Sequence, residues 1–321
     1  MSMDNSATYE ITMNTLFSSL MPIMRYMEDD KIFEVYVNSD DGIVRIDGYE
    51  GREETGVYMS ASQRRQVVDN VAALTGQVTS EDSHPWLDAE IPSNKYFYKC
   101  RFHANLPSIC SAPSFNIRKH PTKIFTLEDY VEREIFTPRQ YEVVIKAIHD
   151  KKNIIAAGGT KSGKTTLLNA FLAEIAKLPD RVVIIEDTPE LQCSSKDVQY
   201  MKTNAHVDMS ILLRHALRMT PDRIVVGEVR GGEALALLDA WSTGHGGGCA
   251  TVHSNSAKDT ITRIENMISR VSVSPQKQTI AQAVDMVVYL KYVGYKRIVE
   301  NIMTINGYDP EKNRISVEYV L

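Results

Sequence analysis

The chain has 321 residues, which at roughly 150 residues per domain predicts about two domains, each large enough for its own buried core. Hydrophobic residues make up 43% and charged residues 24%, the balance of an ordinary soluble globular protein. The formal net charge of −5 argues against a protein that coats nucleic acid or anionic lipid through bulk charge.

The first 118 residues predict a small α+β domain with an antiparallel sheet. Residues 8–28 have mixed helical character. A capping box formed by Ser60 and Gln63 opens a further helix, which Gly76 ends. Turn signals separate short apolar runs that are typical of strands. The predicted strands are Ile32–Val37, Ile43–Ile46, Gly56–Met59, Tyr96–Asn105 and Ser114–Arg118.

Residues 119–130 are predicted to link two domains. The first part of this segment, Lys119–Phe125, is polar and lacks periodicity. Helix-capping signals follow at Thr126 and Thr137. The second domain is therefore expected to span 131–321.

In this second region, short apolar runs alternate with helical segments. That alternation indicates an α/β domain whose mostly parallel sheet is covered on both faces. The predicted strands are Asn153–Ala157, Arg181–Ile185, Arg223–Val226, Ala250–Val252 and Met286–Leu290.

A phosphate-binding motif follows the first of these strands. Residues 158–165 read GGTKSGKT and match the pattern G-x-x-x-x-G-K-[ST] in full. Backbone N–H groups of such a loop, at a helix N-terminus, point at phosphate oxygens. Lys164 supplies positive charge for the β- and γ-phosphates, and Thr165 supplies a hydroxyl for Mg²⁺. The alternative is a chance match on a structural turn. The predicted nucleotide-binding residues here are Gly158, Gly159, Thr160, Lys161, Ser162, Gly163, Lys164, Thr165 and Thr166.

Two further strands end in carboxylates. Glu186 and Asp187 follow one apolar run, and Glu228 follows another, with Gly227 where an aspartate is usual. Ligands of parallel α/β sheets bind at the carboxyl ends of strands. Glu228 can hold Mg²⁺ through water or orient an attacking water. If the phosphate loop were absent, Glu186 and Asp187 would be explained equally well as the solvated end of a strand.

A glycine-rich segment at 244–253 contains two histidines and a cysteine. His253 closes a strand at the same edge, which favours a role in sensing the γ-phosphate. His245 is explained equally well as an ordinary polar residue. Cys249 with the histidines could form a metal site or a thiol nucleophile with its base, but the phosphate loop already accounts for a site here.

Several arginines surround these strands. Phosphoryl transfer needs positive charge on the γ-phosphate oxygens, often from an arginine supplied in trans. Each arginine could equally form a surface ion pair, and the sequence alone does not choose among them. The candidates are Arg214, Arg218, Arg223 and Arg230.

Four blocks in one order carry a resemblance to a known family. They read GGTKSGKTTLLNA, RVVIIEDTPELQC, LRMTPDRIVVGEVRGGEALALLDAW and TGHGGGCATVHS. Together they resemble the secretion and conjugation ATPases of type II and type IV secretion systems. The second block looks like the family's Asp box and the last like its His box. The absence of a tetracysteine zinc motif favours the type IV branch.

The resemblance implies a RecA-like P-loop ATPase domain after a smaller N-terminal domain, with nucleotide between the two and a hexameric ring. It implies that Arg101 and Arg118 of the N-terminal domain approach the phosphates. It makes ATP and Mg²⁺ the ligands and gives roles to residues already singled out. Implied catalytic residues are Lys164, Glu186, Glu228 and His253, with Arg218 and Arg230 as further candidates; implied metal-binding residues are Thr165, Glu186 and Glu228.

Two positions depart from the family pattern. Lys161 stands where the family usually has glycine, and a positive φ there would cost about 1 kcal/mol or more. Thr220 stands where an arginine is frequent, which removes one candidate phosphate contact.

The expected protein is cytoplasmic and peripheral to the inner membrane. The four cysteines form no Cys-x-x-Cys pair and indicate a reducing compartment. There is no signal-peptide pattern and no apolar window of about 18 residues. We expect an ATP-driven motor for a type IV secretion or conjugation machine, docked on inner-membrane components and without sequence-specific nucleic-acid binding. The alternatives are a pilus-assembly or type II secretion ATPase, a DNA-translocating motor, and a slow nucleotide switch or scaffold.

Overall fold

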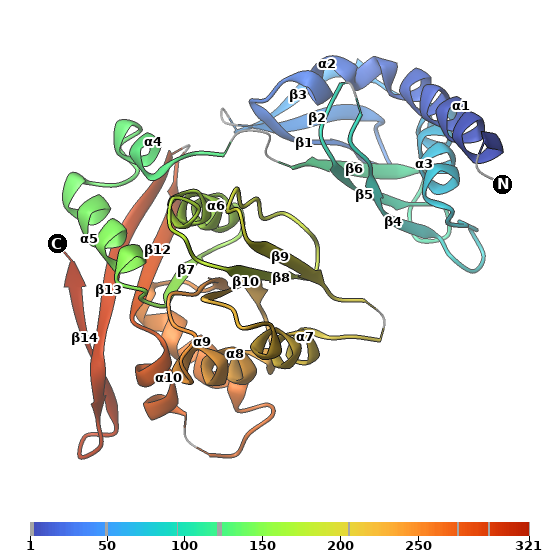
Figure 1. The fold of residues 1–321 in the computed structure, drawn as a ribbon. Coiled ribbons are helices and arrows are strands. Elements are labelled where there is room, and N and C mark those ends of the chain that lie inside the picture. The colour runs from blue at the N-terminus through green and yellow to red at the C-terminus, as the bar shows by residue number, and fades with distance from the viewer. Residues whose placement is uncertain are drawn as a thin grey trace. The chain divides into compact units, whose positions relative to one another are not determined.

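The computed structural model describes residues 3–48, 51–94, 96–120, 124–204, 206–274, 276–294 and 296–320. The chain forms two compact units, Met1–Lys123 and Ile124–Leu321, both drawn in Figure 1. Of the predicted linker 119–130, residues 121–123 lie outside the described residues. Lys119 ends a strand of the first unit, and a helix of the second unit begins at Leu127.

The first unit contains a six-stranded sheet in the order β3-β2-β1-β6-β5-β4, in which all neighbours are antiparallel. This confirms the predicted antiparallel α+β architecture. The edge strand β4 is not among the predicted strands, and β5 begins four residues later than expected. The strands are β1 (Ile32–Val37), β2 (Ile43–Gly48), β3 (Gly51–Tyr58), β4 (Trp86–Ile91), β5 (Cys100–Asn105) and β6 (Ser114–Lys119).

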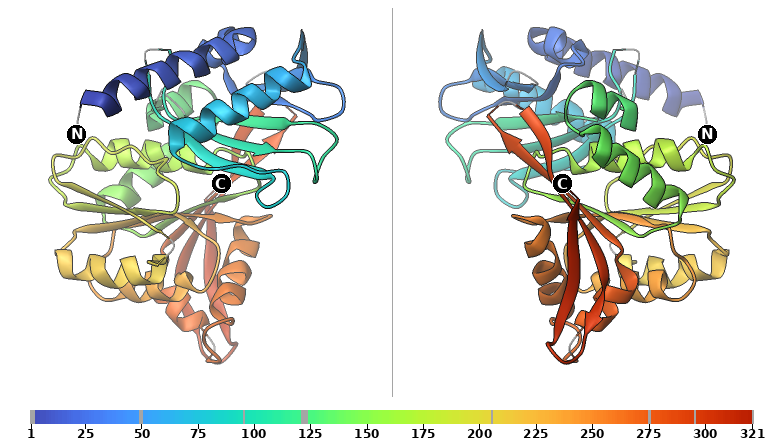
Figure 2. Two further views of the ribbon diagram at one scale, coloured as in Figure 1. Left: turned by 90° about the vertical axis from the view of Figure 1, so that its right-hand side faces the viewer. Right: turned by 90° about the vertical axis from the view of Figure 1, so that its left-hand side faces the viewer.

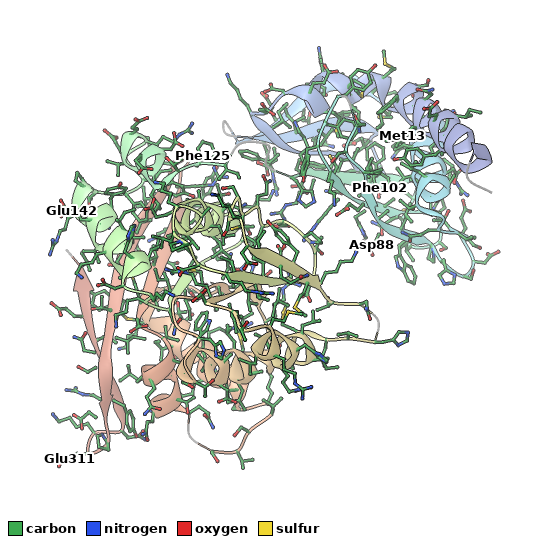
Figure 3. The ribbon with its side chains drawn as sticks, viewed as in Figure 1. Met13, Asp88, Phe102, Phe125, Glu142 and Glu311 are labelled. Carbon is green, nitrogen blue, oxygen red and sulfur yellow. The ribbon has the colours of Figure 1, made fainter. Side chains whose placement is uncertain are left out.

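Helices pack on this sheet to close its core. The predicted capping box opens α3, because the Ser60 hydroxyl and the Gln63 side chain each accept a backbone N–H of the other residue. Met13 of α1 and Phe102 of β5 belong to one buried apolar cluster, and Figure 3 labels both. The helices are α1 (Met3–Leu20), the 3₁₀ helix η1 (Met21–Ile23), α2 (Met24–Glu28) and α3 (Ala61–Thr75).

The second unit contains an eight-stranded sheet in the order β14-β13-β12-β7-β11-β10-β8-β9. The six strands from β12 to β9 run parallel, and the β13–β14 hairpin adds two antiparallel strands at one edge. The five predicted strands correspond to β7, β8, β10, β11 and β12. The strands are β7 (Ile154–Gly158), β8 (Val182–Glu186), β9 (Val198–Lys202), β10 (Arg223–Val229), β11 (Cys249–His253), β12 (Met286–Val293), β13 (Lys296–Asp309) and β14 (Arg314–Val320).

Helices cover both faces of this sheet, as its continuous apolar strands require. Buried residues of α4, α5 and α6 share one apolar cluster, and those of α7 to α10 share another. Figure 2 shows α6 and α7 on opposite faces. These helices are α4 (Leu127–Glu132), α5 (Pro138–His149), α6 (Lys164–Ile175), α7 (Met209–Ala216), the 3₁₀ helix η2 (Leu217–Met219), α8 (Glu233–Ser242), α9 (Ala257–Ile268) and α10 (Lys277–Ala283).

A buried asparagine aligns three central strands. The Asn153 side chain donates to the Ala283 carbonyl oxygen at 2.8 Å and accepts the Gly248 N–H at 2.9 Å. These three residues precede β7, β12 and β11, so the amide fixes where all three strands begin.

Within the described residues, none of the helices is both long enough and apolar enough to cross a membrane.

Candidate active site

The phosphate-loop motif lies at the carboxyl edge of the eight-stranded sheet, between β7 and α6. Gly158 ends β7 and pairs in register with His253 of β11 on one side and Leu290 of β12 on the other. The helix α6 begins at Lys164, so its first N–H groups and its positive dipole end lie at the loop. This strand–loop–helix arrangement is the context that the motif requires.

The loop backbone explains its glycines and its one unusual residue. Gly158 has a φ of +155°, and a Cβ there would lie 2.4 Å from the Leu290 carbonyl oxygen. Gly163 has a φ of +96°. Lys161 has a φ of 62° although it is not glycine. The positive φ that makes a lysine costly at this position is therefore present, at about 1 kcal/mol or more.

The donor groups of the loop fit a polyphosphate. The Ser162 hydroxyl is buried and has no hydrogen-bond partner among the described residues. A buried hydroxyl left in this way costs about 1–3 kcal/mol, and such groups in native proteins indicate a function or a bound polar group. Lys164 and Thr165 begin α6 directly after the loop, so their ammonium and hydroxyl groups add donors suited to phosphate oxygens.

Four ionisable side chains form a continuous series of contacts across this edge. The Lys164 ammonium donates to the Gly159 carbonyl oxygen at 2.8 Å and contacts His253 Nδ1 at 3.2 Å. His253 Nε2 lies 3.0 Å from Glu228 Oε1, and the other Glu228 oxygen accepts from the Arg230 guanidinium at 2.5 Å. Predicted residues from α6, β11 and the end of β10 therefore meet at one place.

The contacts of His253 fix its proton. An ammonium group only donates, so Nδ1 must accept from Lys164 and the ring proton must lie on Nε2, facing Glu228. Burial and the charge of Lys164 lower the pKa of His253, against the opposing effect of Glu228. Burial alone would raise the pKa of Glu228, but the Arg230 guanidinium, with His253 and Lys164, outweighs it and the pKa falls. At neutral pH the site thus holds a neutral imidazole beside an ionised carboxylate.

The second predicted acid is held by its own turn. Glu186 ends β8 and is buried, and its Oε1 accepts the backbone N–H groups of Glu190 at 2.8 Å and Leu191 at 2.9 Å. Gly227 of the neighbouring β10 lies against it, since a Cβ there would be 3.0 Å from Glu186 Cγ. The missing aspartate side chain at Gly227 thus leaves room for the Glu186 carboxylate.

Of the four candidate arginines, one is structural. The Arg223 side chain is 1% exposed, and its Nε contacts Asp180 at 2.7 Å. Its other nitrogens donate to the carbonyl oxygens of Gly247 at 3.0 Å and Ile148 at 2.9 Å. Arg223 is the first residue of β10, at the amino edge, and each of its three guanidinium nitrogens donates a hydrogen bond there.

The other three arginines divide between the two edges. Arg230 follows β10 and holds Glu228, with its side chain 61% exposed. Arg214 lies in the last turn of α7 and Arg218 in η2, both exposed, just before the amino end of β10. Neither Arg214 nor Arg218 therefore joins the phosphate loop of its own chain.

His245 and Cys249, both from the glycine-rich segment, lie away from the site. Cys249 begins β11 at the amino edge, whereas His253 ends it. Burial raises the pKa of the Cys249 thiol to about 12, which removes any nucleophilic role. His245 precedes β11 at the same amino edge. Across the described part of the chain, no cluster of three histidine, cysteine or acidic residues is arranged to hold a metal ion.

In the first unit, Arg101 and Arg118 occupy directly opposite positions on β5 and β6. Glu90 lies opposite Arg101 on β4, and Glu34 lies opposite Arg118 on β1. Opposite residues of an antiparallel pair share one face of the sheet. The two arginines that the family resemblance singles out are therefore neighbours, in a row flanked by acids.

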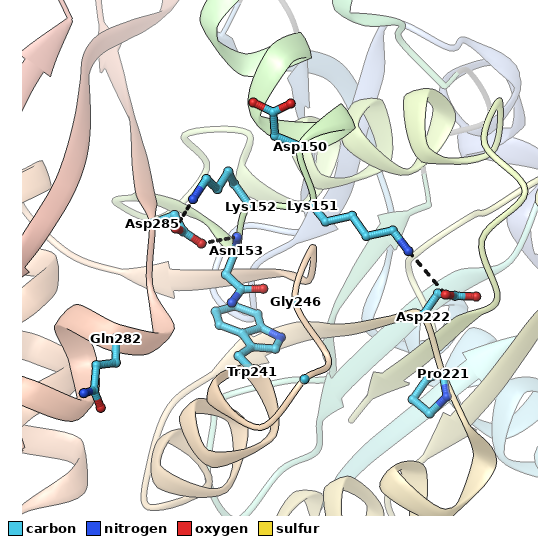
Figure 4. A pocket seen from close by; sticks show the side chains of 11 residues that line it. Asp150, Lys151, Lys152, Asn153, Pro221, Asp222, Trp241, Gly246, Gln282 and Asp285 are labelled. Carbon is cyan, nitrogen blue, oxygen red and sulfur yellow. Dashed lines mark hydrogen bonds and ion pairs between the residues drawn. The ribbon is translucent and has the colours of Figure 1, made fainter.

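A cavity of about 400 Å³ lies at the amino edge of the eight-stranded sheet, opposite the phosphate loop. Figure 4 shows its charged lining. Lys151 contacts Asp222 at 3.3 Å, and Lys152 contacts Asp285 at 2.9 Å. Because these lysines already contact aspartates, and because no predicted site residue lines the cavity, we place the candidate active site at the carboxyl edge.

Two arginines near the loop are not among the predicted residues. The Arg297 Nε donates to the Lys161 carbonyl oxygen at 3.3 Å, across 136 residues of sequence. The charge of Arg263, on α9, contributes to the lowered pKa of His253. Neither residue lies in a motif, so no signal in the sequence identifies them.

Comparisons with known proteins show the family of this chain. A family model described as "Type II/IV secretion system protein" matches residues 20–296. The conjugal transfer protein TrbB of Rhizobium radiobacter is 38% identical over 284 residues, which cover 88% of this chain and 86% of that protein. The type IV secretion system protein VirB11 of Bartonella henselae is 32% identical, over 77% of this chain and 79% of that protein.

A solved structure supports the fold. The Legionella pneumophila ATPase DotB matches with a TM-score of 0.68 at 20% identity, covering 96% of this chain and 81% of that one. The predicted fold class and the predicted family resemblance are both confirmed. The chain belongs to the type II/IV secretion system protein family, with conjugal-transfer TrbB proteins and VirB11 proteins among its relatives.

Proposed function

We propose that this chain is an Mg²⁺-dependent ATPase that powers a conjugal-transfer or type IV secretion machine. The observation that carries the proposal is the meeting of Lys164, His253 and Glu228 beside a complete phosphate loop. The machine itself is inferred from relatives named as conjugal transfer and type IV secretion proteins.

Nucleotide binding would give the Lys164 ammonium new partners. Its present acceptors include a backbone carbonyl oxygen and the neutral ring of His253. Phosphate oxygens are charged acceptors and form stronger hydrogen bonds with an ammonium group. Transfer of Lys164 to the phosphates releases His253 Nδ1 and weakens the positive field on that ring, so the pKa of His253 rises when nucleotide binds.

Glu228 is the residue best placed to orient the attacking water. Its lowered pKa keeps it ionised at neutral pH, so that both of its oxygens accept hydrogen bonds, and Arg230 fixes one of these oxygens. Glu186 is the second acid at this edge, held in place by two backbone N–H groups.

The oxygen groups present suit Mg²⁺, which prefers carboxylate and hydroxyl oxygens together with substrate phosphates. Thr165, Glu228 and Glu186 would hold the ion. When bound, Mg²⁺ neutralises charge on the phosphate oxygens during transfer.

We also propose a homohexamer docked on inner-membrane components. Arg214 and Arg218 lie away from the loop of their own chain and are exposed, which suits a contribution in trans. Arg101 and Arg118, side by side on one sheet face, suit a second group of phosphate contacts from the first unit.

The test is the specific ATPase activity against protein concentration for wild type, Lys164→Ala and Lys152→Ala. Lys152 is a matched control because it is a lysine of the same unit that pairs with Asp285 at the amino edge. We expect activity per chain to rise with concentration, to fall about 100-fold or more in Lys164→Ala, and to persist in Lys152→Ala.

Other outcomes point elsewhere. Activity that is flat with concentration would contradict the ring, and equal losses in both variants would contradict the site. Nucleotide binding without turnover at any concentration would favour the slow switch. Stimulation of activity by added DNA would favour a DNA-translocating motor.

A further inference from the structure

The hairpin formed by β12 and β13 extends beyond the phosphate loop. Leu290 of β12 pairs with Gly158, the last residue of β7. The strand β12 continues to Val293, and β13 begins at Lys296. Residues 291–294, 296 and 297 therefore project past the carboxyl edge of β7, at the place where the loop begins.

Two side chains at this projecting end face each other. Tyr292 and Arg297 are direct cross-strand partners, so both lie on the same face of the hairpin. The Arg297 guanidinium carbon lies 5.4 Å from the centre of the Tyr292 ring. The Tyr292 side chain is 40% exposed, which leaves an aromatic surface open to a ligand.

Arg297 also touches the loop itself. Its Nε donates to the Lys161 carbonyl oxygen at 3.3 Å, and a Cβ on Gly163 would lie 3.1 Å from Arg297 Cδ. Because residue 163 is a glycine, the aliphatic part of the Arg297 side chain can lie against the loop immediately before α6.

The two flanks of the loop carry different chemistry. On the β11 side lie His253, Glu228 and Glu186, the groups suited to the γ-phosphate and its attacking water. On the β12 side lie the exposed aromatic ring and the guanidinium described above. A nucleotide whose terminal phosphate faces the acids must direct its sugar and base toward the other flank.

We infer that Tyr292 and Arg297 form a stacking platform for the base of the bound nucleotide. This inference deepens the proposed function and rests on it. A guanidinium plane and an aromatic ring both attract the flat face of a base, and stacking reads no hydrogen-bonding edge. The platform therefore favours purine over pyrimidine triphosphates and discriminates little between adenine and guanine.

The test separates base stacking from support of the loop. Binding of ATP and of inorganic tripolyphosphate, which has no base, is measured for the full chain and for Arg297→Ala, Tyr292→Ala and Lys296→Ala. Lys296 is an exposed residue of the same hairpin and serves as the control. We expect Arg297→Ala and Tyr292→Ala each to weaken ATP binding about tenfold and to leave tripolyphosphate binding unchanged. We expect Lys296→Ala to bind both ligands like wild type.

Three results would overturn the platform. Equal weakening of ATP and tripolyphosphate would mean that Arg297 only braces the loop through Lys161. Unchanged ATP binding in both variants would mean that the base lies elsewhere. A wild-type chain that binds neither ligand would remove the proposed function, and the platform with it. Tyr292 is exposed, so Tyr292→Ala keeps the inference testable if Arg297→Ala does not fold.

Discussion

The two edges of the eight-stranded sheet carry buried cations in different surroundings. At the amino edge, Arg223 pairs with Asp180 and donates to two backbone carbonyl oxygens. At the carboxyl edge, the 7% exposed Lys164 donates to one carbonyl oxygen and contacts the neutral ring of His253. The first cation has a full-charge partner built into the fold, whereas the carbonyl oxygen and the imidazole that the second contacts carry no net charge.

This difference separates stability from function. A buried ion pair in which each guanidinium nitrogen donates a hydrogen bond is costly to break. An ammonium group on a carbonyl oxygen and an imidazole exchanges those partners readily for phosphate oxygens. We therefore expect changes at the amino edge to affect folding, and changes at the carboxyl edge to affect catalysis.

The largest effect is expected from Arg223→Met. This change leaves the Asp180 carboxylate buried with only Lys151 as its cation, so the free energy of unfolding should fall by about 3–5 kcal/mol. Urea unfolding measures it, with the exposed Arg214→Met as control. A loss below about 1 kcal/mol would show that the amino edge does not depend on this pair.

Glu228→Gln changes the carboxyl edge, where we expect an effect on catalysis and not on stability. The amide keeps the size of the side chain but removes the charge that orients water, so kcat should fall about 100-fold or more. The free energy of unfolding should change by less than about 1 kcal/mol. Steady-state kinetics and urea unfolding test both points, with the exposed Glu311→Gln as control. Unfolding without a selective loss of kcat would contradict the assignment.

The pH dependence of stability should reveal the Lys164–His253 contact. Folding lowers the pKa of His253 below its ordinary value of about 6.5, so just below that value the unfolded chain binds more protons. The contribution of His253 to the free energy of unfolding is therefore complete above about pH 6.5. It is lost as the pH falls toward the pKa that His253 has in the folded chain.

Lys164→Met removes one cause of this shift, so the pKa of His253 should rise toward its ordinary value. A proton NMR titration of the imidazole measures this directly in both proteins. Identical titrations would show that the Lys164 charge does not act on the ring. Glu228→Gln should move the pKa the opposite way, because Glu228 raises it.

The smallest effect is expected at Lys161. Replacing it with glycine relieves a positive φ of 62°, and Glu134→Gly, at a φ of 57° outside the loop, is the matched control. Both variants should change the free energy of unfolding by less than about 1 kcal/mol, because strain relief and the added entropy of glycine oppose each other. Only Lys161→Gly should alter KM for ATP. The same KM change in both variants would contradict a local effect.

The strands that the sequence predicts in the second unit are those buried on both faces of the sheet. β7, β8 and β10 to β12 read as apolar runs for this reason. β9 and the β13–β14 hairpin mix polar and apolar residues and are partly exposed, and they are not among the predicted strands. The predicted capping box at Ser60 is confirmed, and the predicted capping signals at Thr126 and Thr137 also form capping boxes.

The candidate site was predictable residue by residue but not as a set of contacts. The loop motif identifies Lys164, and strand ends identify Glu228 and His253. Their contact depends on β11 lying between β7 and β10, which the spacing of the strands along the chain does not determine. The approach of Arg297 to the loop depends in the same way on a hairpin folded 136 residues away.

The asparagine that aligns the central strands also sets an order of folding. Asn153 precedes β7, but its partners Gly248 and Ala283 lie 95 and 130 residues later in the chain. During synthesis, the apolar strand β7 therefore waits for β11 and β12 before either of its edges is paired. Contacts of such long range fold slowly and leave an exposed strand edge prone to aggregation. Both edges of the strand that leads into the phosphate loop can thus be paired only after most of the second unit has left the ribosome.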